Sequence, residues 1–352
     1  YTNPLFRNQD GTTRIISIWD QSLPEDKSLL PAGVPNRYNA SGASYGTEYT
    51  QEQINEALES DNPLTVVPST DTNGHGTFLA GIAAGGILPN QDFTGAAPEC
   101  ELVIVKLKPA KQYLRDFYLI SNDADAYQEN DIMMGIKYLR VEAYSQRKPL
   151  VILLGIGSNL GSHEGTSPLN VMIQDISRYL GMATVIAAGN ETGRGHHYMG
   201  SVPIGEESVE VEIRVGNAES QRGFVVELWA DTADTYSVGF VSPSGESIGR
   251  IPIIGRNETS IPFLLEPTVI TVNYQLIETG AGKQLVFIRF EAPTNGIWRI
   301  RVYNTQYLTG QFNMWLPAHT LISDETVFLT PSPYTTITLP GDSPSPITVG
   351  AY

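Results

Sequence analysis

Cysteine is almost absent from this chain. Its 352 residues include a single cysteine, Cys100. One thiol cannot close an intrachain disulfide and cannot supply a cysteine-based zinc site. Cys100 lies in an apolar run, and we interpret it as an inert core thiol. The sequence therefore excludes a scaffold that is held together by disulfides.

Positive charge and long apolar runs are also scarce. Lys and Arg number 22 against 38 Asp and Glu, which gives a formal net charge of -16 and argues against nucleic acid or anionic lipid as a partner. No apolar run approaches the roughly 20 residues of a membrane span. No basic and apolar leader is present, and the chain begins with Tyr1. We therefore expect a processed or excised piece of a longer protein.

A glycine-flanked histidine is the most informative feature that is present. Gly74 and Gly76 bracket His75, so the backbone can adopt conformations that a side chain would forbid, and a substrate can approach closely. The small residues that follow, up to Gly85, predict a thin helix with close neighbours. A lone histidine is often structural, but these flanks favour a general base.

Four apolar segments predict the strands of an α/β sheet, at residues 13–20, 102–107, 150–155 and 182–190. Their continuous apolar character suits parallel strands that helices cover on both faces. Helices are predicted at 50–58, where Thr50 and Gln53 have capping-box spacing, at 130–144 and at 169–180. We interpret Asp20, at the end of the first strand, as a loop-capping acid; the alternative is a catalytic carboxylate.

Two of these strands end in candidate site residues, because ligands of open α/β sheets bind beyond the carboxyl ends of the strands. Gly155, Ile156 and Gly157 could let an extended peptide pair with the backbone. Glycines that merely end a strand remain the alternative. Asn190 could donate its amide to an oxyanion, or it could be an ordinary turn residue. His196 and His197 follow, and we interpret them as a surface loop or pocket rim.

From about residue 201 the pattern changes to short strands with period two. These strands are predicted at 209–215, 223–229, 236–241, 284–290, 296–303 and, as the last one, 310–317. Turns at 242–245 and 293–296 separate some of them, and the pattern is typical of an antiparallel sandwich, with a jelly roll favoured. A carbohydrate- or protein-binding function for this part would use Trp229, Trp298 and Trp315, which are more typical of a core.

The histidine motif resembles that of a known family. Residues 73–84 match N-G-H-G-T-x-x-A-G-x-x-A, which is similar to the histidine motif of the subtilisin-like serine proteases, the subtilases. Residues 1–6, 11–21 and 45–55 resemble segments of the branch typified by the clostridial spore-germination proteases. Residues 336–341 and 347–351 resemble the T-x-T-x-P-G and I-T-V-G-A segments that re-enter the subtilase sheet.

This resemblance implies a fold and its division. The expected fold class is α/β, with a subtilase-type parallel sheet, helices on both faces and an inserted all-β jelly-roll domain. The expected domains are an incomplete catalytic core at 1–200, the insert at 201–325 and a return segment at 326–352. The triad aspartate would lie just upstream of Tyr1, and the nucleophile motif would follow the return segment. Ser167 mimics that motif, but Pro168 follows it and it precedes Asn190, so we expect a loop there.

The resemblance also implies a function. His75 would be the triad base, Asn190 the oxyanion donor, and residues 155–157 part of the substrate cleft. We expect a fragment of a serine endopeptidase that is inactive in isolation, with a protein or peptide substrate and a cleaved propeptide as possible partners. The alternative is a pseudoprotease that senses or binds. No cofactor is expected, structural calcium is left open, and a cytoplasmic or spore-associated location is favoured over secretion.

Overall fold

The computed structural model describes residues 1–24, 45–88, 92–253 and 258–351, which form two compact units. The first unit comprises residues 1–109 and 127–155. The second comprises residues 110–126 and the chain from residue 156 onward. Among the described residues, no helix combines the length and apolar character that crossing a bilayer requires.

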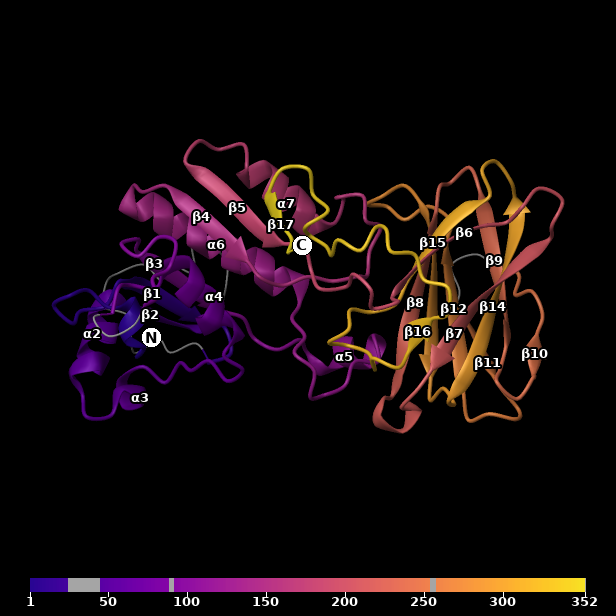
Figure 1. Ribbon diagram of the computed structural model, residues 1–352, viewed down its shortest axis with the longest axis horizontal. Helices are drawn as coiled ribbons and strands as arrows, with labels where there is room; N and C mark the ends of the chain where they lie inside the picture. Colours follow the sequence, from indigo (N-terminus) through magenta and orange to yellow (C-terminus); the bar gives the residue numbers. More distant parts are fainter. Residues whose placement is uncertain (25–44, 89–91, 254–257, 352) are drawn as a thin grey trace. The chain divides into compact units, whose positions relative to one another are not determined.

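The first unit is built around strand β1, Ile15–Asp20. β1 pairs in parallel with β3, Leu102–Lys106, and antiparallel with β2, Thr47–Thr50. The sheet predicted to be parallel is therefore mixed. The remaining elements of this unit, apart from the two helices that cover β1, are η1 Pro4–Phe6, α3 Pro63–Val66, α4 His75–Ala84 and β4 Leu150–Leu154 (Figure 1).

Two helices, α2 (Gln51–Glu59) and α6 (Glu129–Gln146), pack on opposite faces of β1. Ile18 belongs to a buried cluster with Ile54 of α2, while Trp19 packs on Tyr138 of α6 with ring centroids 5.4 Å apart. Successive side chains of a strand point to opposite faces, so β1 is covered on both sides, as predicted. The capping box expected for α2 is present, with Thr50 and Gln53 bonded to each other's backbone amides.

The second unit contains two antiparallel sheets. One has the strand order β10-β9-β14-β7-β16 and the other β11-β12-β13-β8-β15-β6. Their bounds are β6 His197–Ser201, β7 Ser208–Val215, β8 Gly223–Ala230, β9 Thr235–Val241, β10 Ser247–Ile248, β11 Thr259–Pro262, β12 Val269–Gln275, β13 Gln284–Glu291, β14 Gly296–Gln306, β15 Gln311–Trp315 and β16 Val327–Phe328.

A single apolar core joins these two sheets. Phe290 of β13 meets Trp298 of β14 edge to face, with centroids 5.6 Å apart, and both are fully buried. The core draws residues from both sheets, which face each other in Figure 1. The predicted antiparallel sandwich is therefore confirmed. Its jelly-roll connectivity stays a prediction.

The edge strands extend the sandwich beyond the predicted limits. β6 pairs with β15, and β16 pairs with β7. The segment 310–317, expected to hold the last strand, is therefore followed by one more. Sandwich strands begin at His197 and end at Phe328, outside the predicted range 201–325. The three-domain division stays a prediction.

The second unit also holds a small parallel pair. β5, Met182–Ala187, pairs with β17, Ile347–Val349, as expected for a segment that returns to an α/β core. Helix α7, Pro168–Ile176, ends before the predicted Leu180, and the chain turns from Ser177 onward. Two further short elements are α5, Gln112–Phe117, and η3, Ala218–Ser220.

Candidate active site

His75 is the first residue of α4 and its side chain is exposed. The preceding residue, Gly74, has φ +81°, a left-handed conformation that favours glycine. The turn therefore uses Gly74 in the way that the sequence predicts. It delivers the imidazole to solvent at the start of a helix.

The side chains of Asp71 and Asn73 cap this helix. The amide of His75 donates to Asn73 Oδ1 at 3.0 Å, and the amide and hydroxyl of Thr77 donate to Asp71 Oδ2 at 2.9 and 2.6 Å. The other oxygen of Asp71 accepts from the amide of Gly74 at 3.0 Å. These amides have no partners within the helix, so the two side chains satisfy them and fix the turn. Sequence reasoning assigned Asp71 no role.

The carboxylate of Asp71 is held in its charged form. Partial burial alone would raise its pKa, but hydrogen bonds from Thr77, Gly74 and Asn73 outweigh burial and lower it. A negative charge at a helix N-terminus is also favoured by the helix dipole. The His75 turn therefore carries a fixed negative charge on Asp71. Asp71 lies six residues before Thr77, and this spacing could have revealed the cap.

Gly155 lies against His75 within the first unit. A Cβ atom placed on Gly155 would stand 3.6 Å from His75 Cε1 and 2.2 Å from Leu79 Cδ1. The missing side chain thus lets the first turn of α4 approach the residue that follows β4. The structure therefore brings together two of the predicted site residues, the base and the first residue of the substrate segment.

Asn190 follows β5 in the second unit, and its side chain is exposed. The strand end before it is held by two other segments. Ala188 donates its amide to Val349 at 2.8 Å, and its carbonyl accepts from the amide of Thr338 at 2.9 Å. Asn190 itself accepts at its backbone oxygen from Arg194 Nε at 3.5 Å.

The segment around Thr338 joins this strand end to Gly157. The side chain of Thr338 fills the space beside both Gly157 and Gly189, where added Cβ atoms would stand 2.1 Å from its Oγ1 and 2.5 Å from its Cγ2, respectively. Ser158 and Leu339 exchange backbone hydrogen bonds of 3.0 and 2.8 Å. Gly157 and the strand end before Asn190 therefore share a neighbour. Ile156 lies beside Gly157 in the same unit, and its role stays a prediction.

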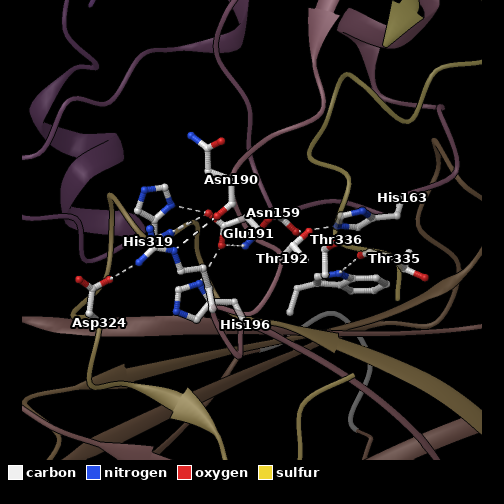
Figure 2. Close-up of polar contacts among 12 residues, drawn as sticks. Asn159, His163, Asn190, Glu191, Thr192, His196, His319, Asp324, Thr335 and Thr336 are labelled. Carbon is white, nitrogen blue, oxygen red and sulfur yellow. Dashed lines mark hydrogen bonds and ion pairs between the residues drawn. The ribbon is translucent and has the colours of Figure 1, made fainter. Parts of the chain in front are cut away.

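A buried carboxylate, Glu191, comes directly after Asn190. Its Oε2 accepts from Asn159 Nδ2 and His196 Nδ1, each at 2.8 Å. Its Oε1 accepts from the amide and the Nδ1 of His319, at 3.1 and 2.6 Å. Figure 2 shows these partners around Glu191, while the Asn190 carboxamide points away from them.

Hydrogen bonding keeps Glu191 ionised although it is only 3% exposed. Burial alone would raise the pKa of this carboxyl, but the bonds from His196, His319 and Asn159 lower it to about 2. Of the two predicted locations for His196 and His197, the surface loop is wrong, because each is 2% exposed, whereas the pocket rim agrees with the structure. With Glu191, these two residues line a cavity of about 310 Å³.

Two imidazoles sandwich an indole near this cluster. His163 and His197 stack on Trp315, with ring centroids 4.2 and 4.7 Å away. The three rings bond to carbonyls of one segment: His197 Nδ1 to Tyr334, Trp315 Nε1 to Thr335 and His163 Nδ1 to Ile337. The segment that leads to Thr338 is thereby fastened. Burial lowers the pKa of both histidines.

Two residues with weaker catalytic signals have structural roles. Asp20 accepts from the amide of Ser22 at 2.9 Å and from Ser69 Oγ at 2.6 Å, and it pairs with Lys106 at 3.2 Å. This is the loop-capping role predicted for it. Ser167 caps α7 by accepting the amide of Asn170 at 3.2 Å, as expected for a loop that leads into a helix.

No group of three or more His, Cys, Asp or Glu residues forms a metal-binding cluster in the described ranges.

The predicted site residues fall into two sets. His75 and Gly155 lie in the first unit, and Ile156, Gly157 and Asn190 lie in the second. The structure brings His75 close to Gly155, and it links Gly157 to the strand end before Asn190.

The comparisons with known proteins agree on one family. A family model described as the subtilase family, peptidase S8, matches residues 15–245. The solved structure of the Clostridium perfringens CspB protease is similar, with a TM-score of 0.81 and 29% sequence identity. The match covers 100% of this chain and 66% of that chain, so this sequence spans about two thirds of its length. A search of curated proteins gave no match.

Proposed function

This chain belongs to the subtilase family, and we propose on that premise that it forms part of a serine endopeptidase that hydrolyses peptide bonds in protein substrates. The observation that carries the proposal is the exposed His75, held at the first turn of α4 beside Gly155. A general base needs access to the proton that it takes, and its position must be fixed. The capped turn provides both.

In the proposed mechanism a serine attacks the amide carbonyl and His75 accepts its proton. His75 then returns that proton to the leaving amine. Asn190 donates to the negatively charged oxygen of the tetrahedral intermediate, an interaction worth about 2.7–4 kcal/mol in subtilisin. The backbone of residues 155–157 pairs with the extended substrate.

We propose that the serine and the triad aspartate belong to segments of the protein outside this sequence, so that the isolated chain is inactive. Two of the chain's own residues with such signals are engaged elsewhere. The Asp20 carboxylate is fully buried and bonded to Ser22, Ser69 and Lys106. Ser167 is a helix cap. The expected lack of a cofactor and the propeptide stay predictions, and structural calcium stays open.

The sandwich is proposed as a supporting domain rather than a sugar-binding one. Trp229, Trp298 and Trp315 are 6%, 0% and 3% exposed. Indoles that stack on sugars need an open ring face. These residues are core residues, as their sequence context suggested.

A fluorophosphonate probe tests the proposal. We expect it to label the full-length protein, to fail on the 352-residue chain, and to fail on full-length His75→Ala. Labelling of the isolated chain would refute the missing nucleophile. A folded full-length protein that neither reacts with the probe nor cleaves a casein digest would instead support the pseudoprotease.

A further inference from the structure

We propose that Glu191 is a positioning residue for Asn190, and that His196, His319 and Asn159 hold Glu191 in place. The inference rests on the proposed function, in which Asn190 donates to the oxyanion. Glu191 does not touch substrate in this proposal. It acts through the backbone that it shares with Asn190.

The geometry separates the two neighbouring side chains. Asn190 is exposed and points away from the cluster, whereas Glu191 is buried within it (Figure 2). Asn190 lies at a bend of the chain after β5, directly after Gly189 with φ +95°, and Glu191 is joined to it through one planar peptide unit. Anchoring the carboxylate of Glu191 therefore fixes the direction in which the Asn190 amide is presented.

The chemistry of the cluster requires a carboxylate. Each oxygen of Glu191 accepts two hydrogen bonds, and all four come from N–H groups, of Asn159, His196 and His319. An ionised carboxylate is an acceptor only, so it satisfies all of these donors. In a glutamine, an NH₂ group replaces one of the two carboxylate oxygens. This NH₂ group would face N–H donors and could not accept their hydrogen bonds.

The cluster also links the oxyanion donor to the substrate segment. Asn159 lies two residues after Gly157, and it reaches Glu191 with its side chain. His196 immediately precedes β6, and His319 lies in the turn that follows β15, so both come from segments connected to sandwich strands. The sandwich thereby sets the relative position of Asn190 and the residues after Gly157, all within the second unit.

A double-mutant cycle in the full-length protein tests the inference. We expect Glu191→Gln to lower kcat by about 10- to 100-fold with KM nearly unchanged, because a displaced donor weakens only the transition state. Asn190→Ala should lower kcat by about 100-fold or more. The double variant should be no slower than Asn190→Ala, since Glu191 acts only through Asn190.

Two further variants separate positioning from general damage. His319→Asn keeps an N–H donor near the place of Nδ1 and should retain kcat, whereas His319→Leu should lose it. Asp234→Asn is the matched control. Asp234 is a buried carboxylate of the same unit that accepts from the amides of Leu308, Thr309 and Gly310. Its effect on kcat should be small and should multiply with that of Asn190→Ala.

The possible failures are distinguishable. If Asn190→Ala leaves kcat unchanged, the proposed role of Asn190 is wrong and this inference falls with it. If Asn190→Ala is slow but Glu191→Gln is normal, or its loss multiplies in the double variant, only the positioning role is overturned. If Glu191→Gln does not fold, equal kcat for His319→Asn and His319→Leu overturns it.

Discussion

The two candidate catalytic groups are held in different ways. Hydrogen bonds within one short turn fix His75, and the bond that spans the most residues joins Asp71 to Thr77, six residues apart. The neighbourhood of Asn190 depends on distant segments. Glu191 bonds to His319, 128 residues away, and Ala188 bonds to Thr338, 150 residues away. The first arrangement can form locally, whereas the second exists only when the second unit is folded.

This difference predicts different responses to mutation. Damage at the His75 turn should change catalysis and leave most of the stability, because the turn is exposed and local. Mutation of the Glu191 cluster should lower both catalytic activity and stability. Buried donors would lose their acceptor, and the segments that meet at Glu191 would lose their common contact. The predictions below separate these two responses.

The largest expected effect is that of His75→Ala in the full-length protein. Loss of the base should lower kcat/KM by about 10⁴-fold or more. The imidazole is exposed, so thermal unfolding should shift by no more than a degree or two. Peptide hydrolysis and a melting curve check both. A large loss of stability would show that the turn is part of the core and would break the comparison.

Glu191→Ala should have the largest effect on stability. Removing the carboxylate leaves buried donors of Asn159, His196 and His319 without their acceptor, and we expect a loss of about 3 kcal/mol in the free energy of unfolding. Urea denaturation measures it. Glu246→Ala is the control, because Glu246 accepts from exposed amides of Leu264 and Leu265 and should cost less than about 1 kcal/mol. Equal losses would contradict a special role for the buried cluster.

Acid should weaken the second unit in two steps. Burial lowers the pKa of His163 and His197 in the folded state, so the unfolded chain binds protons first as the pH falls through about 6.5. Stability contributed by their neutral forms is present above that pH and is lost below it.

The second acid step belongs to Glu191. Its folded pKa of about 2 lies below the ordinary value of 4.5, so its contribution is present above pH 4.5 and is lost as the pH falls toward 2. The loss amounts to about 3 kcal/mol. Urea denaturation between pH 7 and pH 2 should show both steps, and Glu191→Gln should have a smaller second step that retains only the part due to other carboxylates of lowered pKa, such as Asp71 and Asp234. A wild-type protein with no decline below pH 4.5 would contradict the acceptor role.

A smaller effect is expected at Gly155, where the His75 turn meets β4. A Cβ atom at Gly155 would overlap Leu79, so Gly155→Ala should cost about 1–3 kcal/mol and move the first turn of α4. Leu79→Ala removes the overlapping atom, and the double variant should recover part of the loss in both stability and kcat. If the losses caused by Gly155→Ala and Leu79→Ala simply add in the double variant, the close approach of Leu79 to Gly155 is not the cause of the Gly155→Ala effect.

Much of the fold follows from local pattern. The capping box of α2 and the two-faced burial of β1 are encoded in adjacent residues, and both were predicted. The antiparallel pairing of β2 was not, because partner direction depends on how the chain returns to the sheet. β16 was missed because two residues cannot show a period, and only its pairing with β7 makes it a strand.

The candidate site likewise has one part that local sequence predicts and another part that depends on distant residues. His75 and Gly74 could be predicted, because the turn needs a left-handed glycine and the motif displays it. The Glu191 cluster could not, since Asn159 and His319, which complete it, lie 32 and 128 residues from Glu191. A buried role for His197 likewise depends on Asn313 and Tyr334, more than 100 residues along the chain.

The smallest predicted effect tests how local the His75 turn is. Asp71→Asn keeps one acceptor oxygen but removes the charge that favours the helix N-terminus, and the cost should be about 1 kcal/mol. A tilted first turn should still lower kcat about tenfold, because small displacements of a catalytic base are costly. Asp10→Asn alters hydrogen bonds of the same type, from the amide and hydroxyl of Thr12, in another exposed turn of the first unit, and should leave kcat unchanged. If Asp71→Asn also leaves kcat unchanged, the helix alone positions His75, and its turn needs less support than the segment around Asn190.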